Sequence, residues 1–121
     1  MTIYQRASQT YKYGNVKTVI DGIKFDSKHE SMRYIELKYL QRIGQIRDLQ
    51  LQVPFELLPA QKDENGKVKE RAVKYVADFV YYDRDGNLVV EDAKSPVTKT
   101  DSYKLKKKMM RYFKGIEIKE V

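Results

Sequence analysis

The chain has 121 residues, of which 34% are charged, and it carries a formal net charge of +7, one histidine and no cysteine. This composition excludes a disulfide framework, thiol catalysis, and zinc sites built on cysteines or on a pair of histidines. No apolar run reaches the roughly 18 residues that a membrane span needs, and residues 1–8 contain no apolar signal core, so we expect a cytoplasmic protein without a membrane partner.

The N-terminal quarter predicts an arm and a hairpin. Residues 1–15 are mostly polar, with tyrosines at Tyr4, Tyr11 and Tyr13, which is typical of a flexible arm. Residues 16–25 read V-K-T-V-I-D-G-I-K-F. Asp21 and Gly22 form a strong two-residue turn signal between apolar stretches, so this segment predicts a β-hairpin.

Residues 28–43 predict the first helix. Ser27 with Glu30 three residues later is a capping box, in which each residue satisfies a backbone N–H group at the helix start. Gly44 is a typical residue just beyond a helix end. Apolar residues recur at the spacing of an amphipathic helix, namely at Met32, Ile35, Tyr39 and Ile43.

Three extended segments follow and predict strands. Residues 45–59 alternate with period two around a proline, which suits an edge strand. Residues 70–82 and 88–94 are rich in valine and aromatic residues. Turn signals separate them at 62–67 and 83–87, so the last two strands should pair in antiparallel fashion.

The C-terminal part predicts a helix at 101–114, ended by Gly115, and a last strand at 116–121. The order is thus hairpin, helix, three strands, helix and strand. We expect one α/β domain over residues 16–121, with a mixed central sheet flanked by helices.

The positive charge is concentrated in the second helix. Between Lys99 and Lys114 the chain has seven cationic residues against Asp101 alone, a net +6 of the total +7. Four cations share one helical face, at Lys104, Lys107, Lys108 and Arg111, and the expected core-facing stripe is Leu105, Met109, Tyr112 and Phe113. A solvated lysine face would explain this pattern, but like charges on one face repel, which favours contact with a DNA backbone through these four cations and Lys99.

Two acids and a lysine lie on the second and third predicted strands. Asp78 stands in the apolar run V-A-D-F-V, and Asp92 and Lys94 end V-V-E-D-A-K. Pairing across the turn at 83–87 brings Asp78 close to Asp92, and two adjacent carboxylates suit Mg²⁺. Lys94 lies on the same side as Asp92 and could stabilise or deprotonate a water, or neutralise phosphate charge. The alternative places Asp78 on the solvent face.

Glu30 is the third candidate acid. Its place in the capping box explains it without any catalytic role. A glutamate in the first turn of a helix can nonetheless point at the end of a neighbouring strand, so both interpretations stay open.

Three motifs then carry a resemblance: D-G-I-x-F-D-S-x-x-E at 21–30, Y-x-A-D-F at 75–79 and V-V-E-D-x-K at 89–94. Together they resemble the PD-(D/E)XK nuclease superfamily, and within it a family of small phage proteins with a domain of unknown function, akin to phage Holliday-junction resolvases. The resemblance implies a restriction-endonuclease-like αβββαβ core. It also implies metal roles for Asp78 and Asp92, a supporting acid in Glu30 and a catalytic Lys94. Ala77 departs from the superfamily pattern, which has proline there.

The expected function is a Mg²⁺-dependent DNA endonuclease, with Mn²⁺ as a substitute ion. By family analogy the substrate is branched DNA such as a Holliday junction, and two symmetric cuts would need a homodimer in the cytoplasm of a phage host. The absence of a glycine-rich phosphate loop argues against a nucleotide cofactor. The alternatives are a non-catalytic DNA-binding module and an accessory protein of a phage replication or packaging complex.

Overall fold

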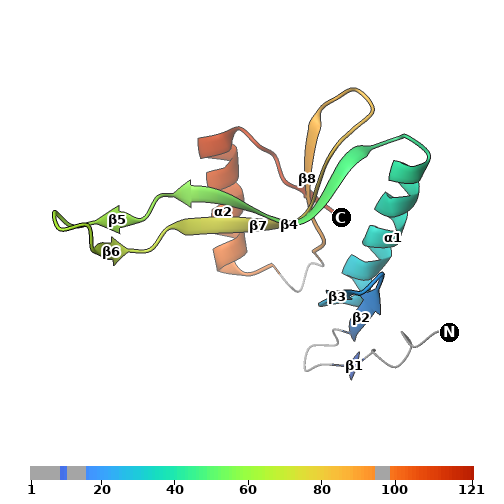
Figure 1. Cartoon of the computed structure of the whole chain (residues 1–121), viewed down its shortest axis with the longest axis horizontal. Coiled ribbons are helices and arrows are strands. Elements are labelled where there is room, and N and C mark those ends of the chain that lie inside the picture. Colours follow the sequence, from blue (N-terminus) through green and yellow to red (C-terminus); the bar gives the residue numbers. More distant parts are fainter. Residues whose placement is uncertain (1–8, 11–15, 95–98) are drawn as a thin grey trace. The chain divides into compact units, whose positions relative to one another are not determined.

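The computed structural model describes residues 9–10, 16–94 and 99–121. They group into two compact units, Met1–Ile46 and Arg47–Val121, which are described separately (Figure 1). The elements in chain order are β1 Gln9–Thr10, β2 Val16–Ile20, β3 Ile23–Phe25, α1 Lys28–Arg42, β4 Arg47–Leu58, β5 Gln61–Lys62, β6 Val68–Glu70, β7 Val73–Tyr82, β8 Leu88–Asp92, α2 Asp101–Met109, η3 Met110–Lys114 and β9 Lys119–Glu120.

The first unit contains the predicted hairpin. Strands β2 and β3 pair in antiparallel fashion, and β1 adds to the other edge of β2. Asp21 and Gly22 both have positive φ, 53° and 75°, as a tight turn between twisted strands requires. The hairpin prediction is therefore confirmed, whereas the arm expected at 1–15 lies outside the described residues except for Gln9–Thr10.

Helix α1 begins and ends as the sequence predicts. The Ser27 hydroxyl accepts a hydrogen bond from the Glu30 N–H over 3.1 Å, and Gly44 adopts φ of 82° beyond the last turn. Its buried apolar residues are Tyr34 and Leu37. The apolar residues at Met32, Ile35, Tyr39 and Ile43 are each about half exposed, because the Tyr34 ring is the one that packs on Phe25 of the hairpin, with ring centroids 5.0 Å apart.

The second unit is built on a mixed four-stranded sheet in the order β4-β7-β8-β9. The first three strands pair in antiparallel fashion and β9 lies parallel to β8. Alternate residues of β4 are shielded from solvent, and β4 is an edge strand, both as predicted. The β5–β6 hairpin continues the β4–β7 ribbon beyond the sheet (Figure 1).

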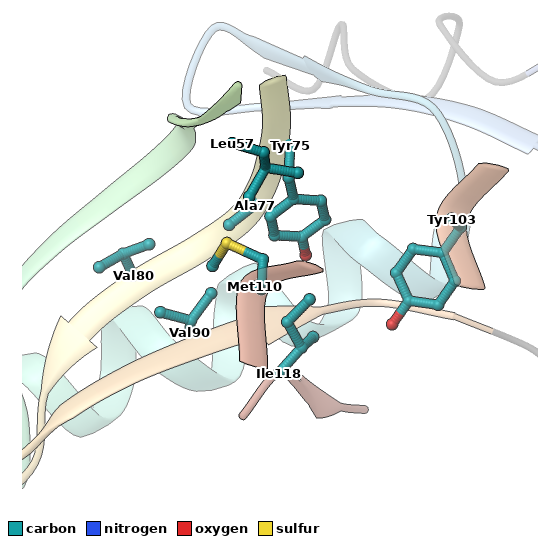
Figure 2. Close-up of a cluster of buried hydrophobic side chains, with 8 residues drawn as sticks. All are labelled: Leu57, Tyr75, Ala77, Val80, Val90, Tyr103, Met110 and Ile118. Carbon is teal, nitrogen blue, oxygen red and sulfur yellow. The ribbon is translucent and has the colours of Figure 1, made fainter. Parts of the chain in front are cut away.

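Helix α2 packs on this sheet, and apolar side chains from both converge (Figure 2). The buried members of this core are Leu57, Tyr75, Ala77, Val80, Val90, Tyr103, Met110 and Ile118. The helix starts at Thr100, whose hydroxyl accepts from the Tyr103 N–H over 3.1 Å. It continues into the π-helical turn η3, and Gly115 ends it with φ of 66°, so the helix predicted at 101–114 is confirmed.

The predicted core-facing stripe of this helix is wrong. Tyr103 and Met110, two turns apart, face the sheet, while Leu105, Tyr112 and Phe113 are exposed and Met109 is only partly buried. Leu105 is exposed although it lies in the regular part of the helix, because the face that carries Tyr103 and Met110 packs on the sheet and leaves the predicted stripe on the other side.

The fold is thus a small α/β protein with two helices, a mixed four-stranded sheet and an N-terminal hairpin. In the part of the chain that the structure describes, neither helix has the length and apolar character to cross a membrane. Whether residues 16–121 act as one domain stays a prediction, since the contacts group them into two units.

Candidate functional site

The ladder between β7 and β8 stops just before Asp78. The last paired residues are Phe79 and Glu91. Beyond this pair, the backbone N–H of Ala93 donates to a side chain instead of a backbone carbonyl. Its acceptor is Oδ2 of the Asp78 carboxylate, over 2.9 Å. Its Oδ1 accepts from Gln52 Nε2 of β4 over 3.1 Å. Both oxygens of Asp78 are thereby oriented from neighbouring strands.

Gln52 holds this bond from an unusual backbone. Its φ is 53°, in the left-handed region, although the residues on either side, Leu51 and Val53, pair regularly with β7. This conformation costs a residue with a Cβ roughly 1–2 kcal/mol. Strain of this kind is concentrated at functional sites.

Asp92 lies beside Asp78 and is only 3% exposed. Tyr75 donates its hydroxyl proton to Asp92 Oδ2 over 2.5 Å, and Lys94 Nζ lies 3.4 Å from Oδ1. No hydrogen bond reaches Oδ1, although it is shielded from solvent. Burial, opposed by the Tyr75 hydrogen bond and by Lys94 and assisted by the charge of Asp78, raises the pKa of Asp92 to about 6.

Tyr103 of α2 connects this acid pair with the helix. Its ring centroid lies 4.8 Å from Lys94 Nζ, which is cation–π geometry. Its hydroxyl donates to Glu120 Oε2 over 2.7 Å. Burial, and then the bond to Glu120, raise the pKa of Tyr103 far above its ordinary range, so the phenol stays a proton donor.

Glu91 belongs to a different environment. It is fully buried, accepts a hydrogen bond from the Tyr81 hydroxyl, and lies 3.9 Å from Lys119 Nζ. Adjacent residues of a strand point to opposite faces, so the two consecutive acids Glu91 and Asp92 have separate partners.

Glu30 lies in the first unit, where it is buried at the start of α1. Its N–H bonds to Ser27, and its carboxylate accepts the Asp26 N–H over 3.4 Å, which is a capping arrangement. Among the described residues no group of three or more histidines, cysteines or acids is placed to hold a metal ion. A metal role for Glu30 therefore stays a prediction.

A basic groove of about 420 Å³ lies along α2 in the second unit. Its lining residues are Lys99, Tyr103, Lys104, Lys107, Lys108, Arg111, Glu117 and Glu120. All five cations that the sequence analysis selected for DNA contact therefore line one depression.

Glu120 organises one end of this groove. Its carboxylate binds Lys99 Nζ over 2.8 Å and Lys107 Nζ over 3.1 Å. The hydrogen bonds from Lys99 and then from Tyr103 hold the pKa of Glu120 at about 2. Lys104 and Lys108 form no ion pair with any described residue, so the groove keeps an excess of positive charge.

The family model described as "Protein of unknown function (DUF1064)" matches residues 10–120. The chain belongs to this family. The match includes the acid pair, Lys94 and the whole basic groove of this DUF1064 protein. No curated protein and no solved structure matches the chain.

Sequence reasoning missed four residues of the site of this DUF1064 protein: Gln52, Tyr75, Tyr103 and Glu120. Tyr75 was visible as the first letter of Y-x-A-D-F, and Glu120 as one of two acids, with Glu117, that follow the basic segment. Nothing local distinguishes Gln52 from Gln50, the other glutamine of its strand. Its contact with Asp78 arises only from the pairing of β4 with β7.

Proposed function

We propose that this DUF1064 protein is a Mg²⁺-dependent endonuclease that hydrolyses phosphodiester bonds in DNA. The observation that carries the proposal is the side-by-side placement of Asp78 and Asp92, with Lys94 next to them. Two neighbouring carboxylates, one of them buried, are unfavourable without a cation. The buried Asp92 Oδ1 accepts no hydrogen bond, although Lys94 Nζ lies 3.4 Å away, so a metal would bind this oxygen next to the ammonium group.

The two carboxylates fit Mg²⁺, which takes oxygen ligands, retains several waters, and is commonly held by one or two carboxylates plus a substrate phosphate. Asp78 and Asp92 would hold the ion, and Mn²⁺ would substitute. When bound, the ion supplies positive charge that activates water and neutralises the phosphate. The supporting role of Glu30 rests on the resemblance to PD-(D/E)XK nucleases.

The chain's own side chains complete the chemistry. Water adds to the phosphorus, the bond from phosphorus to the leaving oxygen breaks, and that oxygen takes up a proton. Lys94 stabilises the negative charge that develops on the phosphoryl oxygens. Tyr75 and the Tyr103 ring hold Asp92 and Lys94 in place, which fixes the geometry before the substrate arrives.

The basic groove would position the DNA backbone. Contacts from lysine and arginine to phosphates supply affinity and orientation without reading the sequence. Membership of the PD-(D/E)XK superfamily, a restriction-endonuclease-like core, a branched substrate and a homodimer are parts of the same proposal, and they rest on family analogy.

A second candidate is a DNA-binding or accessory protein without catalysis. One observation favours it: Tyr75 and Lys94 already lie against the two oxygens of Asp92, and no third metal-ligating side chain joins the acid pair among the described residues. In that case the basic groove would be the functional surface, and the acids would only stabilise the fold.

A cleavage assay separates the two candidates. The purified protein is incubated with a labelled four-way junction or a linear duplex, in Mg²⁺, Mn²⁺ or EDTA, beside Asp92→Asn. Asp85→Asn, an exposed aspartate in the turn before β8, is the matched control. Cleavage that requires the divalent ion and is lost only in Asp92→Asn supports the nuclease. A folded wild type that cuts neither DNA contradicts it.

A further inference from the structure

An aromatic pair lies next to the basic groove. Tyr112 and Phe113 directly follow Arg111, which lines the groove. They are 83% and 51% exposed, and their rings meet edge to face with centroids 5.0 Å apart. Nothing in the described chain covers Tyr112.

The pair lies on an irregular turn of the helix. Residues Met110–Lys114 form the π-helical turn η3. Met110 at its start is fully buried in the core, while the next two apolar side chains emerge into solvent. Single π-helical turns are rare and frequently occur at functional sites. The turn therefore carries two exposed aromatic rings beside a residue that is anchored in the core.

The surroundings of the pair are cationic. Arg111 and Lys114 flank it in the sequence, and Lys108 lies one turn earlier on the groove face. An apolar protein partner would have to desolvate these charges, whereas a polyanion with flat apolar faces is complementary to both features. Proteins that bind single-stranded nucleic acid combine a cationic groove for phosphates with aromatic rings for bases.

We propose that Tyr112 and Phe113 form a stacking site for unpaired bases of DNA whose phosphates lie in the basic groove. The inference rests on the proposed function and names its substrate class: DNA with unpaired nucleotides at an end, a gap or a branch point. Bases inside a duplex are stacked on one another and cannot offer their faces to these rings.

Binding without cleavage tests this. Affinities for a single-stranded oligonucleotide of about 12 nucleotides and for a duplex of the same sequence are measured in EDTA. Tyr112→Leu/Phe113→Leu keeps the apolar size and removes the aromatic faces, and Tyr112→Phe keeps the ring. Tyr39→Leu makes the same change at another exposed tyrosine. A 2-aminopurine base in the single strand reports stacking by its quenching.

The double variant should weaken single-strand binding by roughly 5- to 150-fold per stacked base, with duplex affinity changed less than about twofold. Quenching should disappear in the double variant and persist in Tyr112→Phe and Tyr39→Leu. Equal loss on both DNAs, or no loss, overturns the inference. So does conversion of a dimer into a monomer in sedimentation, which would make the pair an interface between copies.

A variant of the basic groove distinguishes failure of the stacking site from failure of the proposed function. Lys104→Gln/Lys108→Gln should weaken binding to both DNAs. If it does so while the aromatic change has no effect, the stacking site is wrong and nucleic-acid binding stands. If the groove variant changes nothing, or the wild type binds no DNA, the proposed function and the inference both fall.

Discussion

Gln52 donates a hydrogen bond to Asp78 across the β4–β7 pair, and it does so from a left-handed backbone with φ of 53°. A strand residue with a Cβ gains nothing from this conformation. The side-chain amide, however, reaches Asp78 Oδ1 over 3.1 Å while Ala93 N–H holds the other oxygen. The strained glutamine thus fixes one of the two acids of the candidate site.

Substitutions of Gln52 should distinguish the effect of its strained backbone on stability from the effect of its side chain on cleavage. Gln52→Gly relieves the left-handed strain and Gln52→Ala keeps it, so the glycine variant should be the more stable by about 1 kcal/mol in chemical denaturation. Both remove the amide that orients Asp78, so both should lower divalent-ion-dependent cleavage. An alanine variant as stable as the glycine variant would contradict the strained backbone.

Asp92→Asn should stabilise the fold in the absence of divalent ions. The pKa of Asp92 is raised from 3.8 to about 6, so between these values the unfolded state loses its proton first, and wild-type stability falls as pH rises through this window. Asparagine carries no charge and still accepts from Tyr75. The free energy of unfolding at neutral pH should rise by about 1–3 kcal/mol and lose its dependence on pH in that window. A destabilised Asp92→Asn, beside an unchanged Asp85→Asn, would show that the carboxylate is structural.

Divalent ions should stabilise the wild type. An ion that binds only the folded state raises stability by RT ln(1 + [L]/Kd), which is about 2.7 kcal/mol at 100 times Kd. Thermal unfolding in increasing Mg²⁺ or Mn²⁺ should therefore show a rising midpoint in wild type and in Asp85→Asn. The shift should vanish in Asp78→Asn. An equal shift in all three would mean that the ions bind elsewhere.

Two lysines of the basic groove should carry part of the salt dependence of DNA binding. Each duplex phosphate that the protein no longer neutralises reduces the slope of log K against log salt by about 0.9. Lys104→Gln/Lys108→Gln should therefore lower both affinity and slope. Lys67→Gln/Lys69→Gln removes the same charge from the exposed β5–β6 hairpin and should leave the slope nearly unchanged. Equal effects of the two pairs would indicate only a general attraction to positive charge.

Glu120 should make the fold sensitive to acid. Its pKa is lowered from 4.5 to about 2 by Lys99 and Tyr103, so its contribution is fully present above pH 4.5 and is lost as pH falls towards 2. Its side chain is 21% exposed, and solvent screening reduces the effect to about 1–2 kcal/mol. Glu120→Gln should remove that part of the acid-induced loss in denaturant titrations. An unchanged pH profile would contradict the ion pairs with Lys99 and Lys107.

The sequence alone predicted the features that depend on local chemistry. Turn residues at Asp21-Gly22, the cap at Ser27 and the glycine after each helix act within a few residues of the chain, so element order and most boundaries followed from them. The clustering of cations on one face of α2 could also be predicted, because residues three or four apart in the sequence are neighbours on a helix surface.

Tertiary packing decided which apolar stripe of each helix is buried. Two stripes at helical spacing compete on α1, and contact with Phe25 selects Tyr34 over Tyr39. On the second helix, packing on the sheet selects the face of Tyr103 and Met110 over the face of Leu105. Strand pairing decided the rest of the site, since only pairing in space sets Gln52 against Asp78 and Tyr75 against Asp92. The sequence by itself determined which groups are available and where the chain turns. Which of them meet, which are buried and which acid has its pKa raised depends on contacts between residues far apart in the chain, and only the tertiary structure decides these.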